Sequence, residues 1–385
     1  MIKCLAILFL AVVANISSAD SLSLPPKELW PSARRQQASG DGLIQNGVLY
    51  LAEQTEANDN DGTFGYVRAF DVQTGNKIWE RGSGKDYVGT YPRSLAFGFD
   101  QLFFFDQQIR PHTWSTALHA ISPKDGNVIW TREDVGSPVP PVVTKDSLVV
   151  ANDEVTAGKP QLFALDPKTG QTKWQRSLFA PGLFPTTMVY DEKTNSVTLV
   201  FLANGVAGTG VYNFDAGDGH LRWNQDLVET PRFSQPTLTG DGDVIFGDVH
   251  GYYKYNLLKG HLVWKREVIG LIVDACAMAA LNDGTEVAVV NYEGRLHYLN
   301  LKDGVESGGI DTSKDGLYIR PVVVGDKVLV ISQDGYLKVY DLNSSQLLWS
   351  SLRFDSRGGP PAPIYANGIA VVVGSSGYTE AWDFH

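Results

Sequence analysis

One pattern recurs along almost the whole chain. An apolar stretch ends in Asp, Asn or Ser, a Gly follows four residues later, and a Trp follows four residues after that; Asp166, Gly170 and Trp174 form the clearest copy. Short Asp and Asn side chains accept hydrogen bonds from nearby backbone N–H groups in turns, and Gly adopts positive φ at little steric cost. Each copy therefore predicts a tight turn between two β-strands, with the Trp on the second strand.

Seven copies share this spacing, and three anchor positions are substituted, by Ser122, Ser345 and Gly308. Successive Trp positions lie 41 to 51 residues apart, a period typical of β-propeller blades. Because one Trp occurs in each period, we expect each to pack against the neighbouring copy. The copies are Asp71/Gly75/Trp79, Ser122/Gly126/Trp130, Asp166/Gly170/Trp174, Asp215/Gly219/Trp223, Asn256/Gly260/Trp264, Asn300/Gly304/Gly308 and Asp341/Ser345/Trp349.

A second hairpin pattern lies between these copies, so each period contains four strands. Residues 321–324 and 327–332 are two apolar runs joined by Gly325-Asp326, and Asn46-Gly47 and Asn367-Gly368 are further turn dipeptides. No segment after the N-terminal 19 residues shows sustained helical periodicity. The fold class is therefore predicted to be all-β.

The two ends of the chain determine the predicted number of blades. Residues 363–365, 369–373 and 378–384 supply three strands of a further unit that has no Trp-bearing strand. Trp30 stands near the N-terminus with no hairpin before it. Pairing these two ends would complete the unit and remove its open edges. We therefore predict an eight-bladed β-propeller in which the N-terminal strand closes the last blade.

The first residues resemble a secretory signal. Lys3 precedes an apolar run at 4–14, and Ser17-Ser18-Ala19 suits signal peptidase cleavage. We assign 1–19 to a signal peptide and 20–385 to a single propeller domain, in a secreted or exported protein of an extracellular, periplasmic or endomembrane compartment. No later stretch approaches the roughly 18 apolar residues of a membrane span, so no membrane insertion is expected. The net charge of −11 argues against a nucleic-acid partner.

The repeat resembles a known family. Its form Ala-x-Asp-x-x-Thr-Gly-x-x-x-Trp, at 164–174 and 69–79, is similar to the PQQ-type repeats of quinoprotein dehydrogenases. It is also similar to the cofactor-free propellers of the BamB type, which are bacterial outer-membrane assembly lipoproteins. The resemblance covers essentially all of 20–385. It implies the propeller architecture, whereas the repeated residues are scaffold and do not specify an activity.

Candidate binding residues fall on the face opposite the Trp hairpin turns. Irregular segments at 53–64, 82–91 and 106–115 are expected to be long loops there, and such loops tend to carry binding residues. Arg110, His112 and Trp114 offer a cation, an imidazole and a stacking surface for a ligand; alternatively, Trp114 packs over its own blade. A second set precedes or begins innermost strands and either binds an acidic ligand or pairs with carboxylates between blades: Arg93, Arg232, Arg320 and Arg357.

No metal site or cofactor is assigned. Segment 58–62, Asn-Asp-Asn-Asp-Gly, resembles a calcium loop, but the position that needs Glu would be Arg68. The family's PQQ enzymes are characterised by adjacent cysteines, a Ca²⁺ site and a catalytic Asp. This chain has two separate cysteines, Cys4 and Cys276, so PQQ and Ca²⁺ are disfavoured. Cys276 lies in an apolar run and is interpreted as a small buried hydrophobe.

Together these features predict a monomeric binding or scaffolding module. Its partner would be a protein or small molecule bound on the loop-rich face. The alternative is an enzyme that uses the central funnel, such as a PQQ-dependent oxidoreductase. The two hypotheses differ in the surface they require: a convergent polar pocket for an enzyme, or a broad apolar or aromatic patch for a binding module.

Overall fold

The computed structural model describes residues 22–34, 38–54, 65–82, 90–110, 113–136, 139–152, 161–178, 183–203, 209–227, 236–248, 251–267, 278–281, 284–290, 295–311, 321–332, 335–352, 363–373 and 378–385. These residues form eight four-stranded antiparallel sheets. The predicted signal segment lies outside them, so its assignment and the single-domain boundary at residue 20 remain predictions. Within the described residues, no helix is long and apolar enough to cross a membrane.

Each sheet is one blade, and in seven of the eight blades the strands follow one another in sequence order. The first four blades are β2 (Ala38–Gln45), β3 (Val48–Gln54), β4 (Gly65–Asp71), β5 (Lys77–Gly82); β6 (Thr90–Gly98), β7 (Gln101–Arg110), β8 (Thr113–Ile121), β9 (Val128–Arg132); β10 (Val142–Val143), β11 (Leu148–Asn152), β12 (Gln161–Leu165), β13 (Thr172–Ser177); and β14 (Leu183–Asp191), β15 (Ser196–Ala203), β16 (Thr209–Asp215), β17 (Leu221–Leu227).

The other four blades complete the ring. They are β18 (Thr237–Leu238), β19 (Asp243–Asp248), β20 (Gly251–Asn256), β21 (Leu262–Glu267); β22 (Met278–Leu281), β23 (Glu286–Val290), β24 (Arg295–Asn300), β25 (Glu306–Asp311); β26 (Val322–Val324), β27 (Lys327–Ile331), β28 (Leu337–Asp341), β29 (Leu347–Ser350); and β30 (Ile364–Ala366), β31 (Ile369–Val373), β32 (Tyr378–Asp383) with β1 (Lys27–Arg34).

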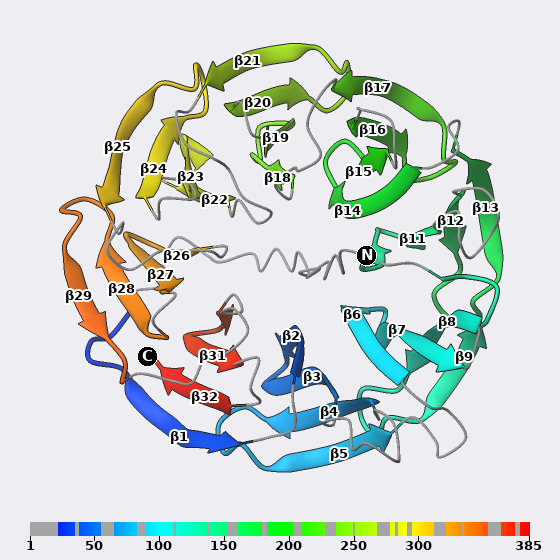
Figure 1. Cartoon of the computed structure of the whole chain (residues 1–385), viewed down its shortest axis with the longest axis horizontal. Helices are drawn as coiled ribbons and strands as arrows, with labels where there is room; N and C mark the ends of the chain where they lie inside the picture. The colour runs from blue at the N-terminus through cyan, green and yellow to red at the C-terminus, as the bar shows by residue number, and fades with distance from the viewer. Residues whose placement is uncertain are drawn as a thin grey trace.

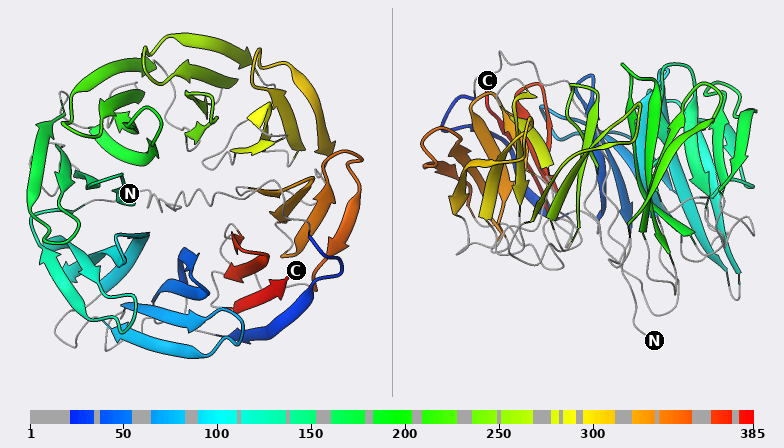
Figure 2. Two further views of the ribbon diagram at one scale, coloured as in Figure 1. Left: turned by 180° about the vertical axis from the view of Figure 1, so that it is seen from behind. Right: turned by 90° about the horizontal axis from the view of Figure 1, so that it is seen from above.

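The blades stand around a central axis, with the first strand of each blade innermost and the fourth outermost (Figure 1). Seen from above, the strands run between the two faces of the ring (Figure 2). Turns between first and second strands, and between third and fourth strands, lie on one face, which we call the hairpin face. Connections between second and third strands, and between blades, belong to the opposite face, called the loop face. The predicted eight-bladed propeller is confirmed.

The eighth blade is built from both ends of the chain. β1 pairs antiparallel with β32, with Lys27 opposite Asp383 and Trp30 opposite Ala381. The N–H of Ser23 also donates to the carbonyl of Phe384 at 2.7 Å. Leu22 is buried in the apolar cluster between the seventh and eighth blades. The N-terminal strand therefore closes the ring as the sequence predicts.

The apolar core is divided among the interfaces between blades. Eight clusters of buried hydrophobic residues are present, and each draws its side chains from two neighbouring blades. In one of them, Trp79 and Tyr50 of the first blade pack with Leu102 and Phe104 of the second. The second and third strands of the blades are buried on both sides, as β11 and β12 show, which explains their near-continuous apolar runs. The scaffold is held by these interfaces and leaves side chains at the two faces for other roles.

Candidate functional site

The hairpin face is occupied by the repeated turns, whose polar groups are used internally. Asp71 Oδ1 accepts hydrogen bonds from the N–H and the hydroxyl of Thr74, both at 2.8 Å. Asp166 makes the same contacts with Thr169, at 2.9 and 3.0 Å. The hydroxyl hydrogen bonds are the main cause that lowers the pKa of both carboxyls. These aspartates hold turns and are poorly placed for catalysis.

Six of the seven repeated turns also receive the Trp of the preceding blade. The indole N–H donates to a carbonyl in the next blade at 2.7 to 3.1 Å, and that carbonyl always follows the Asp, Asn or Ser anchor. Trp349 instead meets Trp382 and Phe384 edge-on at centroid distances of 6.0 Å. The donor and acceptor pairs are Trp30–Val72, Trp79–Pro123, Trp130–Pro167, Trp174–Ala216, Trp223–Leu257 and Trp264–Leu301.

A second contact between blades comes from the residue two positions after the Trp. The guanidinium of Arg132 donates to the carbonyl of Gly170 at 2.6 Å, and Arg176 donates to the carbonyl of Asp218 at the same distance. Related contacts are made by Arg81, Gln225 and Arg266. Sequence reasoning missed this role, although the Trp-x-Arg signal occurs in four copies of the repeat.

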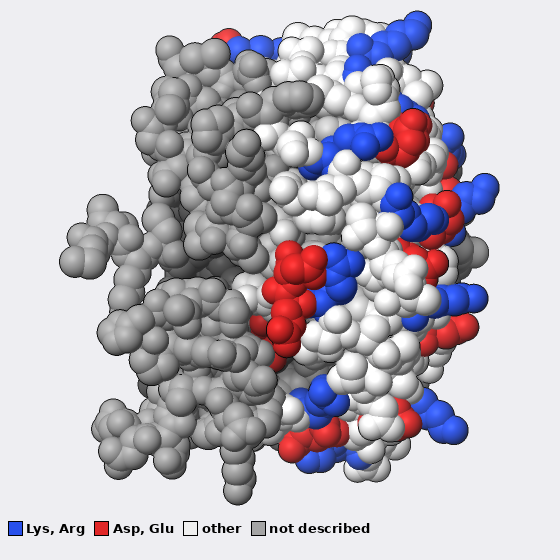
Figure 3. Space-filling view, turned by 90° about the vertical axis from the view of Figure 1, so that its right-hand side faces the viewer, with Lys and Arg blue, Asp and Glu red and all other residues white. Residues whose placement is uncertain are grey.

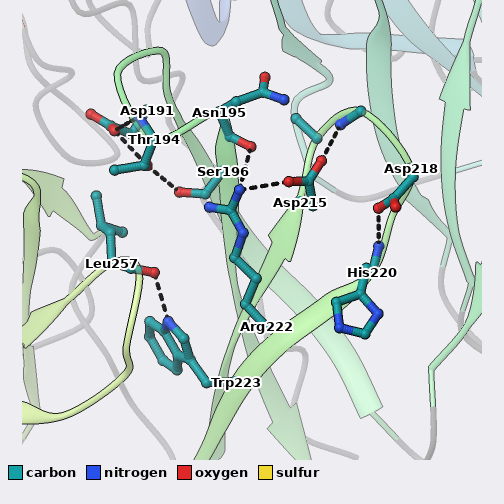
Figure 4. Close-up of polar contacts among 12 residues, drawn as sticks. Asp191, Thr194, Asn195, Ser196, Asp215, Asp218, His220, Arg222, Trp223 and Leu257 are labelled. Atoms are coloured by element: carbon teal, nitrogen blue, oxygen red, sulfur yellow. Dashed lines mark hydrogen bonds and ion pairs between the residues drawn. The ribbon is translucent and has the colours of Figure 1, made fainter.

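The fourth blade has an additional polar network at this face. Arg222 reaches Asp215 Oδ2 at 2.6 Å and lies 3.5 Å from the carbonyl of Asn195, while neighbouring Trp223 points at the carbonyl of Leu257 (Figure 4). The Arg222 pair therefore connects the turn between the first and second strands with the turn between the third and fourth. This arrangement is structural, because its groups bind one another inside the turns.

Three of the predicted binding residues lie in described strands of the second blade. Arg93 lies in β6, the innermost strand of the second blade, opposite Phe105. Arg110 ends β7 opposite Thr113, and Trp114 pairs with Ile109. The register thus brings Arg110 and Trp114 to the tip of one hairpin. The other four predicted residues lie outside the described part of the chain: His112, Arg232, Arg320 and Arg357.

The expected loop at 106–115 is wrong in one respect. β7 continues to Arg110 and β8 resumes at Thr113, so most of this segment is a paired hairpin. Its Ile, Thr and Trp side chains favour extended structure, and the ladder continues as far as the Arg110–Thr113 pair. The other two predicted loops, 53–64 and 82–91, lie between β3 and β4 and between β5 and β6. Their central residues are outside the part of the chain that the structure describes.

Two buried titratable side chains lie in the same hairpin, at the interface with the first blade. Asp106 is 8% exposed, and its Oδ1 accepts no hydrogen bond from the described residues. Burial raises the pKa of Asp106 to about 6, against the opposing charge of Arg81. Burial also lowers the pKa of His119 to about 4, and Arg81 adds to that effect. His119 stacks on Phe104 at 5.1 Å, and its Nδ1 lies 2.9 Å from Thr131 Oγ1.

The first blade contains a buried ion pair at the end of β3. Arg68 Nη1 lies 2.6 Å from Glu53 Oε2, and Arg68 Nε lies 2.8 Å from Glu80 Oε2. The Glu53 side chain is fully buried. Among the described residues, no group of three or more His, Cys, Asp or Glu side chains could hold a metal ion.

Charges on the outer wall are mixed rather than segregated. On the side that carries β9 and β13, Lys and Arg lie beside Asp and Glu (Figure 3). Examples are Arg132 with Asp134 at 2.6 Å and Lys173 with Asp146 at 3.1 Å. Among the residues of this wall that the structure describes, no single-signed field of the kind that steers a highly charged ligand is present.

The cysteines do not match the adjacent pair that characterises the PQQ enzymes. The sequence has two cysteines, Cys4 and Cys276, which are far apart in the chain, so the adjacent pair expected over the quinone cannot form. Segment 58–62 and Cys276 lie outside the described residues. The disfavoured status of PQQ and Ca²⁺ therefore remains a prediction from the sequence.

The closed ring and its repeated Asp, Gly and Trp contacts define the class of protein: an eight-bladed β-propeller built from PQQ-type repeats. The chain belongs to the family described as outer membrane protein assembly factor BamB, whose model matches residues 26–133, 106–183 and 194–384. A protein of that name from Burkholderia pseudomallei is 24% identical over 371 residues, which cover 86% of this chain and 94% of that protein. A second protein of that name, from Shewanella oneidensis, is 22% identical, and the match covers 87% of this chain and 97% of that protein.

Solved structures show the same fold. BamB from Moraxella catarrhalis matches with a TM-score of 0.63 at 16% identity, covering 92% of this chain and 97% of that one. A europium-containing methanol dehydrogenase matches with a TM-score of 0.66 at 12% identity, covering 94% and 84%. The computationally designed Ika8 protein gives 0.68 at 15% identity, covering 93% and 99%. Similarity at this level extends to an enzyme and a designed protein, so it demonstrates architecture alone.

Proposed function

We propose that this chain is an exported scaffold that takes part in outer membrane protein assembly by binding partner proteins on its loop face. The observation that carries the proposal is membership of the assembly-factor family over almost the whole ring. The two relatives named above align over nearly their full length. The described geometry agrees with a scaffold role. The repeated Asp, Gly and Trp residues hold the blades together, and the loop face is left for recognition.

Within that face, the proposed contact residues are Arg110 and Trp114. They lie at the tip of the β7–β8 hairpin, where the ladder extends as far as the Arg110–Thr113 pair. Arg and Trp are also the residue types that most often dominate the binding energy of protein interfaces.

The experiment is complementation in a Shewanella oneidensis strain that lacks its own relative. The chain is expressed with its N-terminal segment, and the amount of folded outer membrane protein is measured by heat-modifiable electrophoretic mobility. We expect the wild type to raise that amount and the Arg110→Glu, Trp114→Ala double variant to fail, with unchanged thermal unfolding. Lys124→Glu, an exposed change on the hairpin face of the same blade, is the matched control and should behave as wild type.

Two results would count against the proposal. An exported, folded chain that leaves the amount of folded outer membrane protein unchanged would contradict the assembly role. Full activity of the double variant would instead show that Arg110 and Trp114 are not part of the binding site, while the assembly role would still stand.

A further inference from the structure

Exposed apolar side chains are concentrated in one sector of the ring. Ten large hydrophobic side chains are exposed among the described residues, and seven of them lie on the fifth, sixth and seventh blades. The described residues of the third and fourth blades contribute none. The seven are Leu258, Leu262, Val263, Val305, Leu347, Leu348 and Leu352.

Six of these side chains lie in the turns, or at the turn ends of the outer strands, on the hairpin face of three neighbouring blades. We call this set the apolar rim: Leu258, Leu262, Val263, Val305, Leu347 and Leu348. Leu258 and Leu262 share the fifth-blade hairpin. Val263 and Val305 flank the contact in which Trp264 packs on Gly304. The sixth blade then meets the seventh where Ser345 Oγ donates to the carbonyl of Gly309 at 3.2 Å, two residues before Leu347.

The fold does not require apolar residues at these positions. The third blade has Thr172 and Lys173 where the fifth has Leu262 and Val263, with the same register irregularity before the Trp. The exposed fractions of Leu258 and Leu262 are 55% and 47%. Exposed large apolar side chains gathered on neighbouring elements mark interaction sites in soluble proteins.

The segment that carries the fifth-blade part of the rim is basic, on a chain whose net charge is −11. Residues 256–266 contain Lys259, Lys265 and Arg266 and no acidic residue. Arg266 is engaged with the carbonyl of Asp303, whereas Lys259 is exposed. The Lys265 side chain is 40% exposed and meets Glu267 at 3.6 Å. This combination complements a surface that is both apolar and acidic.

We propose that the apolar rim is a second protein-binding surface, which docks a segment of a partner protein carrying apolar and acidic side chains together. It goes beyond the proposed function, since it lies on the hairpin face and uses none of the loop-face residues. Apolar contacts along Leu258, Leu262 and Val263 supply the affinity, and Lys259 and Lys265 select acidic partners.

The test uses the full folded chain and a fluorescein-labelled synthetic peptide in which Leu and Glu alternate, with binding measured by fluorescence anisotropy. Leu262→Glu should weaken binding about tenfold or more, because it places a charge in the centre of the contact. Thr172→Glu, the same change at the equivalent position of the third blade, should leave binding unchanged. Lys265→Glu should also weaken binding and reduce its salt dependence, whereas Gln175→Glu, its third-blade counterpart, should not.

Four results would overturn the proposal. They are no binding of the peptide, equal binding by wild type and Leu262→Glu, and equal binding of a peptide with Lys in place of Glu. The fourth is a Leu262-dependent association with a different occupant. Co-sedimentation with anionic phospholipid vesicles would assign the rim to a membrane surface. Self-association of the chain in light scattering would assign the rim to a second copy of the chain. Loop-face variants of Arg110 and Trp114 should bind the peptide as wild type does, so failure here is separable from failure of the proposed function.

Discussion

At the scale of single residues, the interface between the sixth and seventh blades is the instructive exception. Gly308 stands where other blades have Trp, and Ser345, at φ 60°, stands where other turns have Gly. The two substitutions are complementary, because no indole lies over Ser345. Tyr298 lies directly opposite Gly308 and packs in the cluster between these blades. In four other blades the residue opposite Trp is Ala, so bulk has moved from the outer strand to its neighbour.

This compensation predicts that two matched substitutions change the free energy of unfolding by very different amounts. Gly219 has φ +73°, and a Cβ there would lie 2.6 Å from the ring of Trp174. Gly219→Ser should therefore destabilise the protein by about 2 to 4 kcal/mol, from left-handed strain and overpacking. Ser345→Gly should stay within about 1 kcal/mol of wild type, because relief of strain offsets the lost hydrogen bond to Gly309. Urea unfolding measures both; equal losses would refute the compensation.

Asp106 gives a pH-dependent prediction at the same scale. Its folded pKa of about 6 exceeds the ordinary aspartate pKa of 3.8, so the buried charge costs stability above pH 6, and that cost disappears as pH falls towards 4. Asp106→Asn should therefore be more stable than wild type by about 1 to 2 kcal/mol at pH 7.5 and no more stable at pH 4. His119 is present in both proteins, so its opposite trend cancels from the difference. A pH-independent difference in urea unfolding would contradict this account.

At the scale of strands, a shared irregularity shapes all eight outer edges. In each blade the outer strand has one extra residue immediately before the Trp or its equivalent: Leu29, Ile78, Ile129, Lys173, Arg222, Val263, Ser307 and Leu348. Bulges bend and twist an edge strand, which hinders pairing with another chain. β1 reproduces the bulge although it comes from the other end of the sequence.

The repeat explains why strands were predictable and recognition was not. Turns such as 166–170 and the packing of Trp174 depend on neighbouring residues that recur in most copies, so one copy supports another. The spacing from Gly to Trp along the sequence does not show whether each residue between them has a partner on the neighbouring strand. The bulge at Lys173 therefore could not be predicted from the repeat. Arg110 and Trp114 occur once, in a segment without internal repetition, so the sequence supplied their residue types but not their surroundings.

The contacts made after the Trp belong to this scale as well, and Arg132 tests them. Its Nη1 donates to the carbonyl of Gly170 across the blade interface, and its other nitrogens bind Asp134. Arg132→Ala should lower the free energy of unfolding by about 1.5 to 3 kcal/mol, as expected for a hydrogen bond from a charged group. Arg295→Ala removes a half-exposed pair with Glu306 within one blade and should cost less than about 0.5 kcal/mol. Equal losses would deny the interface contact any special role.

At the scale of the whole molecule, closure joins eight interfaces into one cooperative ring. Each cluster of buried apolar residues is shared by two blades. Loss of one blade would therefore expose the apolar side of each blade next to it. The eighth blade depends on β1 for its outer strand and for Trp30, whose indole N–H donates to the carbonyl of Val72 in the first blade. One short N-terminal segment therefore completes both the eighth blade and its contact with the first.

Removing residues 22–34 should consequently open the ring rather than trim it. The edge of β32 and the cluster containing Ile44, Leu49 and Phe70 would lose their cover, and exposed edges and apolar surface promote aggregation. We expect oligomers and precipitate in size-exclusion chromatography with light scattering, and recovery of monomer when a synthetic peptide of residues 22–34 is added during refolding. The same peptide with Trp30→Ala should recover less. A soluble, cooperatively folded monomer without the segment would show that the other blades hold the ring on their own.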